Sequence, residues 1–453
     1  MRSINPATDE LIAEYPEMTP PELRASLDAC DAAFRRWRSE PIAARARPMR
    51  ELARLLRAER DRLAVLATRE MGKHVRDSRA EVEKCAWACE YFAENAADFL
   101  REEVIATDAR RSRVVYAPLG IVLAVMPWNF PYWQVIRFMA PAFMAGNAVL
   151  LKHASNVTGS ALAVEELTRR AGFPEGLLTV LRCTSAAVPG VIADERVRGV
   201  TLTGSEPAGA AVAAAAGKYV KKAVLELGGS DPYVVLEDAD LDVASRMCVA
   251  GRLVNGGQSC VAAKRFIVAE RVLPEFRSRV VEAMAAARMG DPMDESVTLG
   301  PLARRDLRDE VHSQVTRSLK AGARLLLGGK LPPGPGAYYP ATVLDGVRPG
   351  IPAFDEEVFG PVASLVLARD EDEAFTLANS SRFGLGAAIF TRDEARGQRM
   401  AEERLDAGMC FVNTNVRSDP RLPFGGVKAS GYGRELGSHG IREWVNVKLI
   451  YLA

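Results

Sequence analysis

Short apolar segments alternate with helical ones through most of this chain, and this alternation restricts the fold more than any other feature. In the first series, segments of strand length occur at 121–126, 148–152, 178–181, 199–203 and 223–226. Parallel strands need long crossover connections, which are usually helices. The pattern therefore predicts a parallel sheet with helices on its faces, in the α/β class.

A second series of strands is expected at 232–236, 265–268, 363–368, 387–391 and 408–413. Helices are expected between them at 241–255, 272–289 and 306–321. The first hundred residues show instead the periodicity of amphipathic helices, at 20–38, 41–70 and 75–100. Because 453 residues exceed one ordinary core, we expect two αβ domains, each with an open sheet.

The composition is that of a soluble globular protein, with 48% hydrophobic and 26% charged residues. A net charge of +1 gives no reason to expect a nucleic acid or an anionic membrane as a partner, so a small-molecule ligand is expected. The N-terminal residues contain no apolar stretch of the kind found in secretory signals, which favours a cytoplasmic protein.

Seven cysteines are scattered through the chain, and this odd number does not suggest a disulfide framework, so reduced thiols are expected. The four histidines lie far apart, and no second Cys or His pair accompanies Cys85 and Cys89. We therefore expect no metal site.

Residues 119–151 are apolar enough to suggest a membrane span, and Arg137 is their only charged residue. Prolines interrupt this stretch and its flanks resemble strands, so a buried αβ unit is favoured. A guanidinium group in such an apolar run needs a partner. The candidates are a protein carboxylate and the anionic group of a ligand.

Two residues in glycine-rich surroundings suggest catalysis. Cys260 ends the run Asn-Gly-Gly-Gln-Ser-Cys, and Glu226 lies 34 residues earlier, directly before Leu-Gly-Gly. A thiol attacks carbon well, and a nearby carboxylate can deprotonate the water that releases the covalent intermediate. A lone cysteine is more often a buried structural residue, but the glycines allow a ligand to approach closely. The pair is therefore a candidate nucleophile and base.

The expected strand at 199–203 leads through Gly204, Ser205 and Gly209 into an alanine-rich helix. A strand, a glycine turn and a helix N-terminus form the arrangement that receives a pyrophosphate. The glycine spacing matches neither the usual dinucleotide fingerprint nor a P-loop, so this signal is weak when taken alone. Lys152 ends a neighbouring strand, at the edge where open αβ sheets bind ligands.

Seven motifs make the chain resemble the aldehyde dehydrogenase superfamily of NAD(P)-dependent enzymes over essentially its whole length. They are Pro127-Trp128-Asn129-Phe130-Pro131, the segment around Lys152, Thr203-Gly204-Ser205 with Gly209, Leu225-Glu226-Leu227-Gly228-Gly229, Gly257-Gln258-Ser259-Cys260, Glu356-Glu357-Val358-Phe359-Gly360-Pro361 and Pro423-Phe424-Gly425-Gly426-Val427-Lys428. The resemblance implies a Rossmann-like NAD(P)-binding domain at 1–105 and 118–228, and a catalytic domain at 229–421. It also implies oligomerisation strands at 106–117 and 440–453, and a loop at 422–439 that bridges the domains.

The resemblance implies that Cys260 attacks the aldehyde carbon, while the Asn129 amide and the backbone N–H of Cys260 hold the oxyanion. Glu226 then deprotonates the water that hydrolyses the thioester, and the product is a carboxylic acid. The implied cofactor-binding residues are Trp128, Lys152, Ser155, Gly204, Ser205, Gly209, Gly228, Glu357 and Phe359. In the family, such residues bind NADP or NAD.

Arg137 is similar to the arginine with which succinate-semialdehyde dehydrogenases hold the distal carboxylate of their substrate, and the chain most resembles the shorter members of that group. Succinate semialdehyde is thus the expected substrate, with Phe424 at its tunnel. A second arginine, found in some of these enzymes six residues before the nucleophile, is replaced by Val254 here. Arg252 is the nearest arginine in sequence, and Arg417 and Arg421 lie on the loop before Pro423. These three are the candidates to complete a carboxylate clamp.

Other functions remain open at this stage. A tunnel lined by Trp133, Phe138 and Phe424 would suit other short aliphatic or aromatic aldehydes. A CoA-acylating enzyme is disfavoured because Glu226 favours hydrolysis of the thioester. A non-catalytic binding or structural protein on the same fold is disfavoured by the complete catalytic set, and no histidine has a context that suggests it activates Cys260 in a cysteine hydrolase.

Two segments near the expected oligomerisation region, at 112–117 and 444–452, alternate like strands. In the family such strands build the subunit interface. A homodimer or homotetramer is therefore expected.

We predict that NADP is used at least as well as NAD. Many NAD-preferring members of the family have a glutamate three residues after the lysine, where this chain has Ser155, and a carboxylate there would repel a 2′-phosphate. Lys152 and Ser155 can instead receive that phosphate. Ser155→Glu should shift the ratio of kcat/KM toward NAD, as steady-state kinetics with both cofactors would measure. A wild-type preference for NAD of several orders of magnitude would contradict the prediction.

Overall fold

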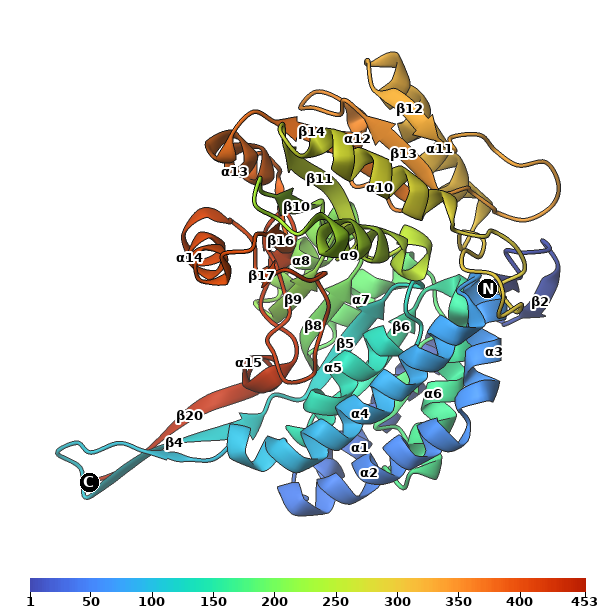
Figure 1. The fold of residues 1–453 in the computed structure, drawn as a ribbon. Coiled ribbons are helices and arrows are strands. Elements are labelled where there is room, and N and C mark those ends of the chain that lie inside the picture. The colour runs from blue at the N-terminus through green and yellow to red at the C-terminus, as the bar shows by residue number, and fades with distance from the viewer.

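Two open sheets form the framework of the computed structural model, which describes residues 1–453 (Figure 1). The first sheet has the strand order β19-β9-β8-β5-β6-β7, and all its strands are parallel except β19. Its strands are β5 Ile121–Met126, β6 Ala148–His153, β7 Leu178–Val180, β8 Val197–Thr203, β9 Lys222–Glu226 and β19 Gly431–Tyr432. The first predicted series is confirmed, and the C-terminal region adds an antiparallel strand that the alternation did not predict.

The second sheet has the order β12-β13-β14-β11-β10-β16-β17, and only β12 is antiparallel to its neighbour. Its strands are β10 Asp231–Val235, β11 Ala263–Ala269, β12 Arg324–Leu327, β13 Thr342–Asp345, β14 Val362–Ala368, β16 Gly386–Phe390 and β17 Met409–Val412. Five of them match the second predicted series. The other two, β12 and β13, have four residues each, too few to show a period in the sequence.

Helices surround both sheets, and the N-terminal helices lie together beside the first one (Figure 1). The longer helices are α1 Pro20–Trp37, α2 Ile42–Ala58, α3 Arg60–Met71, α4 Val75–Phe99, α5 Trp133–Met144, α6 Thr158–Arg170, α8 Glu206–Lys218, α9 Leu241–Leu253, α10 Leu273–Ala285, α11 Arg305–Lys320, α13 Glu371–Asn379 and α14 Glu394–Arg404. The short ones are α7 Val188–Ala193, α12 Pro352–Asp355 and α15 Gly437–Arg442, with 3₁₀ turns η1 Ser155–Val157, η2 Ser185–Ala187 and η3 Val254–Gly257.

Three helices differ from the sequence prediction, and one of them, expected at 272–289, ends at Ala285. The segment at 41–70 forms two helices, because Glu59 leaves the helical conformation between α2 and α3 with φ −108° and ψ 16°. The helix expected to reach residue 255 ends at Leu253, and Asn255 and Gly256 then adopt positive φ angles within η3. Apolar periodicity does not report such a left-handed turn, which leads into the loop of Cys260.

The apolar stretch at 119–151 is a buried strand, helix and strand, as predicted. Strands β5 and β6 pair in parallel, and every residue of α5 between them is buried, including Arg137. No helix of the structure combines the length and the apolar character that crossing a bilayer requires.

A third sheet projects from the rest of the molecule as a ribbon (Figure 1). Strands β4 Arg111–Pro118 and β20 Val445–Leu452 pair antiparallel along their full length, and β3 Glu103–Val104 pairs with the other edge of β4. The apolar residues Val447, Leu449 and Tyr451 of this ribbon are exposed. Two further pairs complete the strand set, β1 Arg2–Ile4 with β2 Leu11–Glu14 and β15 Phe383–Gly384 with β18 Val427–Lys428.

A buried ion pair fixes the segment after β5. Lys73 and Glu81 form a salt bridge with side chains that are almost fully buried. Oε1 of Glu81 also accepts the backbone N–H groups of Tyr132 and Trp133 at 2.8 and 2.9 Å. The ammonium of Lys73 lies 3.9 Å from the ring centroid of Phe130. Helix α4 thereby holds the start of α5 and the residues just before it.

We predict that Glu81→Gln lowers the free energy of unfolding by about 3–5 kcal/mol, because the glutamine leaves the buried Lys73 ammonium without its counter-ion. Urea unfolding followed by circular dichroism measures the change, and adding Lys73→Met should restore part of the loss. The matched control is Glu83→Gln in the same helix, whose exposed ion pair with Arg57 should contribute at most about 1 kcal/mol. Equal effects of the two glutamine variants would contradict the prediction.

Candidate active site

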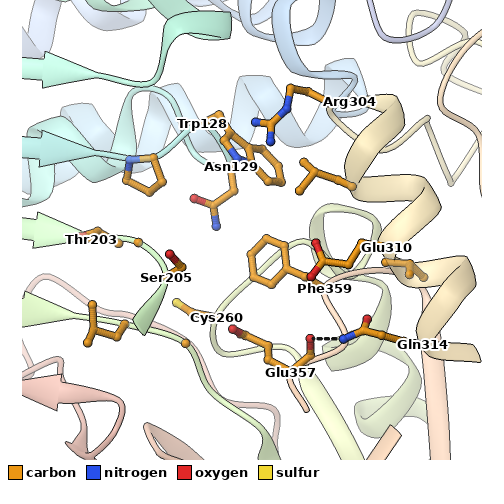
Figure 2. A pocket seen from close by; sticks show the side chains of 16 residues that line it. Trp128, Asn129, Thr203, Ser205, Cys260, Arg304, Glu310, Gln314, Glu357 and Phe359 are labelled. Atoms are coloured by element: carbon orange, nitrogen blue, oxygen red, sulfur yellow. Dashed lines mark hydrogen bonds between the residues drawn. The ribbon is translucent and has the colours of Figure 1, made fainter. Parts of the chain in front are cut away.

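A cavity of 380 Å³ lies where the carboxyl ends of the first sheet's strands meet helix α11 and the loop before β14 (Figure 2). Ligands of open αβ sheets bind at this edge. The cavity brings together most of the residues expected for catalysis and cofactor binding, namely Trp128, Asn129, Gly204, Ser205, Gly228, Cys260, Glu357 and Phe359. The expected residues that do not line it are Lys152, Ser155, Gly209 and Glu226.

The loop that carries Cys260 begins in a sharp left-handed turn. Asn255, Gly256 and Gly257 have φ angles of 53°, 64° and 77°. A Cβ at Gly257 would lie 2.2 Å from the carbonyl oxygen of Gly360, so only glycine fits there. The turn is thus held against the loop that precedes β14.

Two side-chain amides bind the same carbonyl group ahead of the nucleophile. Nδ2 of Asn129 and Nδ2 of Asn255 each donate to the carbonyl oxygen of Gln258 at 3.1 Å. Asn255 also donates to the carbonyl oxygen of Asn129 at 2.7 Å. Figure 2 shows the Asn129 amide and the Cys260 sulfur directed into the same cavity. The second N–H of the Asn129 amide can therefore donate to an oxygen bound beside the sulfur.

Lys264 is a buried residue of this site that the sequence patterns did not single out. Its Nζ donates to the carbonyl oxygens of Ser259 and Cys260 at 2.8 and 2.6 Å. The same Nζ lies 3.2 Å from Oε1 of Glu357. Two adjacent charged residues, Lys264 and Arg265, at the start of the buried strand β11 were the available sequence signal. Lys264 connects the nucleophile's loop to the carboxylate expected at the nicotinamide ribose.

Burial raises the pKa of the Cys260 thiol to about 12, although the nearby cations of Arg137 and Lys264 act in the opposite direction. The resting residue is therefore a thiol, and only its thiolate is a strong nucleophile.

Glu226 ends β9 and is fully buried, and neither carboxylate oxygen has a hydrogen-bond partner. Burial raises the pKa of this carboxyl group well above its usual value, and repulsion by the carboxylate of Glu435 adds to the effect. Arg137 opposes the shift. A carboxyl group with a raised pKa is suited to take a proton near neutral pH. Glu435 lies in a glycine-rich segment near the C-terminus, and the sequence patterns did not indicate it.

Arg137 has a protein carboxylate as its partner, which answers the question left by the sequence. It forms a buried salt bridge with Glu435, and its NH2 group donates to Oγ1 of Thr203 at 3.1 Å. Its guanidinium carbon lies 4.6 Å from the ring centroid of Phe424. The side chain still lines a second cavity, described next.

The second cavity measures 260 Å³, and Cys260 lines it as well as the first. Arg137, Phe424 and Arg417 also contribute to its lining, and Arg417 is an exposed residue. Arg421 does not line this cavity but forms a salt bridge with Asp419. Two residues not expected from the sequence, Lys84 and Ser418, complete one part of its wall.

The first cavity fits a dinucleotide. A Cβ at Gly228 would lie 2.3 Å from Oε2 of Glu357, so a glycine is required where this carboxylate approaches the backbone. Oε1 of Glu357 accepts the N–H of Gly229 at 3.0 Å. The rings of Trp128 and Phe359 meet edge to face at 5.8 Å. Together they form an aromatic wall beside an anionic hydrogen-bond acceptor.

The remaining expected cofactor residues surround this cavity. Ser205 is the N-cap of α8, which begins at the cavity, and a Cβ at Gly209 would lie 2.5 Å from the Leu227 side chain. Lys152 ends β6, and burial lowers its pKa. Ser155 begins the turn η1 that follows. A helix N-terminus and a lysine at neighbouring strand ends suit anionic phosphate groups.

The model of the aldehyde dehydrogenase family matches residues 1–450 of the chain. The chain belongs to the aldehyde dehydrogenase family. The family identified from the sequence motifs and its α/β fold are both confirmed, and the chain is an NAD(P)-dependent oxidoreductase that acts on aldehydes.

Curated relatives match the aldehyde dehydrogenase over almost its full length. It is 48% identical over 449 residues to the succinate semialdehyde dehydrogenase [NAD(P)+] of Escherichia coli strain K12, which covers 99% of this chain and 97% of that protein. It is 47% identical over 451 residues to the probable succinate-semialdehyde dehydrogenase [NADP(+)] of Synechocystis, with coverage of 100% and 99%.

Solved structures of similar proteins have the same fold. The succinic semialdehyde dehydrogenase from Streptococcus pyogenes, crystallised in complex with NADP+, matches with a TM-score of 0.97 and 39% identity. The match covers 100% of this chain and 99% of that one. The protein Gox0499 matches with a TM-score of 0.98 and 40% identity, over 100% and 99% of the two chains.

We predict that iodoacetamide alkylates Cys260 of the cofactor-free enzyme slowly at pH 7, and that the rate rises about tenfold per pH unit up to pH 10. The pKa of about 12 leaves the thiolate a small fraction throughout this range. Loss of activity and the mass of the peptide that contains Cys260 measure the rate, with Cys260→Ala as the control for other thiols. A plateau near neutral pH would contradict the prediction.

Proposed function

We propose that this aldehyde dehydrogenase oxidises succinate semialdehyde to succinate with NADP or NAD, and that NADP is favoured. The observation that carries the proposal is that Cys260 lines both cavities, one suited to a dinucleotide and one with cationic side chains in its wall. The names of the relatives from Escherichia coli, Synechocystis and Streptococcus pyogenes support it.

In the first step, the Cys260 thiol gives its proton to a water molecule, and its sulfur forms a bond to the aldehyde carbon. The electron pair of the broken C=O π bond moves to the carbonyl oxygen, which becomes an oxyanion. The free N–H of the Asn129 amide and the backbone N–H of Cys260 donate to this oxygen. Because Asn129 is fixed by its bond to Gln258, the donor is already oriented when the charge develops.

A bound nicotinamide cofactor supplies the hydride acceptor that converts the thiohemiacetal to a thioester. Glu357 would hold the nicotinamide ribose, with Trp128 and Phe359 beside it, and Gly228 leaves room for this carboxylate. Gly204 and Ser205 form the turn and the helix N-terminus that would receive the pyrophosphate. Gly209 allows α8 to pack closely against the Leu227 side chain. Lys152 and Ser155 receive the adenosine ribose and its 2′-phosphate.

In the last step, Glu226 removes a proton from the water that attacks the thioester, and Cys260 leaves as the thiol. Glu226 directly precedes Leu227 and Gly228, which line the first cavity, and no hydrogen bond holds its carboxylate in place. The proposed step requires this carboxylate to turn toward the thioester. Its raised pKa makes it a strong enough base for this proton transfer at neutral pH.

The substrate lies in the second cavity, with its aldehyde at Cys260. Phe424 packs along its carbon chain, and Arg137 and Arg417 supply positive potential around its carboxylate. Part of the charge of Arg137 is neutralised by Glu435, so its contribution is smaller than that of an unpaired arginine. Arg421 does not contact the substrate in this proposal. It forms a salt bridge with Asp419 on the outside of the loop that carries both residues.

The domain division predicted from the sequence, at 1–105 with 118–228, 229–421, 106–117 with 440–453, and 422–439, is part of the proposal. We also propose a cytoplasmic homodimer or homotetramer. The exposed apolar side chains of the β4 and β20 ribbon support an interface between copies, since a projecting sheet with an apolar face gains stability when covered.

The test of the proposal is a panel of aldehydes measured with both cofactors by the absorbance of the reduced cofactor. We expect the highest kcat/KM for succinate semialdehyde, with no activity in Cys260→Ala. A neutral aldehyde that surpasses succinate semialdehyde would contradict the substrate assignment and leave the reaction type intact.

We predict that Glu226→Gln separates the two halves of the reaction. Hydride transfer needs no base from Glu226, whereas thioester hydrolysis does, so rapid mixing should show a burst of about one reduced cofactor per subunit. The steady rate afterwards should fall by about 10²–10⁴-fold. Loss of the burst together with the steady rate would show that Glu226 also acts before the thioester forms.

A further inference from the structure

Lys84 of helix α4 lies in the wall of the second cavity, together with Cys260 and Arg137. Its ammonium donates to both the carbonyl oxygen and Oγ of Ser418 at 2.7 Å. It also lies 4.4 Å from the ring centroid of Trp133. The side chain is thus held at a fixed place in the cavity wall by a neutral residue and an aromatic ring.

No carboxylate lies within salt-bridge distance of Lys84. Two carboxylates, those of Asp77 and Glu81, line the same cavity, and each has another partner; that of Asp77 is Arg76. Glu81 pairs with Lys73 and accepts two backbone N–H groups. Asp419 pairs with Arg421. Burial lowers the pKa of Lys84 to about 8, and repulsion by Arg137 adds to this effect. A buried cation without a counter-ion is costly, and an anion that enters the cavity removes that cost.

Lys84 is half-buried, whereas Arg137, the fully buried cation of this wall, is already compensated. Arg137 forms its salt bridge with Glu435 and lies over the ring of Phe424. Of these two cations, Lys84 therefore gains more from an anionic ligand. Both cations line the same cavity as the nucleophile, and Arg137 is close enough to influence the pKa of both Cys260 and Lys84.

We propose that Lys84 binds the distal carboxylate of the substrate and sets the preference of the enzyme for aldehydes that carry one. This inference rests on the proposed oxidation of succinate semialdehyde. The volume of this cavity, 260 Å³, is smaller than the roughly 300–1,000 Å³ of pockets that bind drug-sized ligands. A cavity of this size suits a four-carbon substrate. When the aldehyde group lies at Cys260, the distal carboxylate of the substrate accepts from the Lys84 ammonium in place of the two oxygens of Ser418. It also supplies the negative charge that Lys84 lacks.

The test compares succinate semialdehyde with butanal, which has a methyl group in place of the carboxylate. Lys84→Met keeps the length of the side chain and removes its charge. We expect kcat/KM for succinate semialdehyde to fall at least about tenfold, through KM, and that for butanal to change less than about threefold. Lys84→Arg should retain most of the preference. Lys320→Met, at the exposed end of α11, is the matched control and should change neither value.

Equal losses for both aldehydes would overturn the proposal, because they would show that Lys84 only holds the loop of Ser418 in place. Unchanged values for both would overturn it as well. Should Lys84→Met fail to fold, as judged by its melting temperature, Lys84→Gln provides the same comparison.

The two hypotheses are tested by different numbers from this experiment. The wild-type ratio of kcat/KM for the two aldehydes tests the proposed function, and the change of that ratio in Lys84→Met tests the role of Lys84. If the wild type prefers butanal, the substrate assignment fails. A selective loss for the anionic aldehyde in the variant would then still support Lys84 as its binding group, and the absence of a selective loss would overturn it.

Discussion

The left-handed turn ahead of Cys260 is the constraint on which the rest of the site depends. Three consecutive residues with positive φ reverse the chain between α9 and β11, and Gly257 touches the backbone of Gly360 so closely that no side chain fits. Arg252 donates to the carbonyl oxygen of Gly257 at 2.7 Å, and the next carbonyl groups are bound by Asn129, Asn255 and Lys264. The nucleophile is therefore fixed relative to both sheets by buried donors.

Charged groups are concentrated around this fixed loop. Those that form ion pairs with each other have a structural role, and those without a partner are available for chemistry. The pairs of Lys73 with Glu81 and of Arg137 with Glu435 are buried and mutually satisfied. Cys260, Glu226 and Lys84 are among the groups whose charged forms lack such a partner, and burial disfavours the charged form of each. A substrate or a water molecule that enters the site can solvate these groups or pair with them. The protonation states of these groups therefore change as the reaction proceeds.

The sequence predicted the parts of the structure that follow from periodicity and from contiguous motifs. Both strand series, the buried unit around Arg137 and the gathering of Trp128, Asn129, Cys260 and Glu357 at one cavity fall in this class. A motif is a contiguous segment of sequence. It therefore reveals functional residues only where they lie close in sequence to recognisable features such as glycines and strand ends.

The residues that the sequence did not reveal act across long separations. Lys84 lies in an ordinary amphipathic helix, and only its contact with Ser418, 334 positions later, makes it part of the site. Glu435 likewise matters through Arg137 and Glu226. Lys264 was visible as one of two adjacent charges in a buried strand, but its acceptors depend on the turn geometry. The partner of Arg137 could not be chosen for the same reason.

The C-terminal segment completes parts of the molecule that are formed much earlier in the chain. Strand β19 pairs with β9, which ends at Glu226, and β20 pairs with β4. Phe424 and Glu435 meet Arg137. These pairings cover one edge of β9 and one edge of β4, and they give the buried Arg137 guanidinium its counter-ion. The environment of Arg137 is thus built from two distant segments, and a proteolytic cut that released the later one would remove the counter-ion of a buried cation.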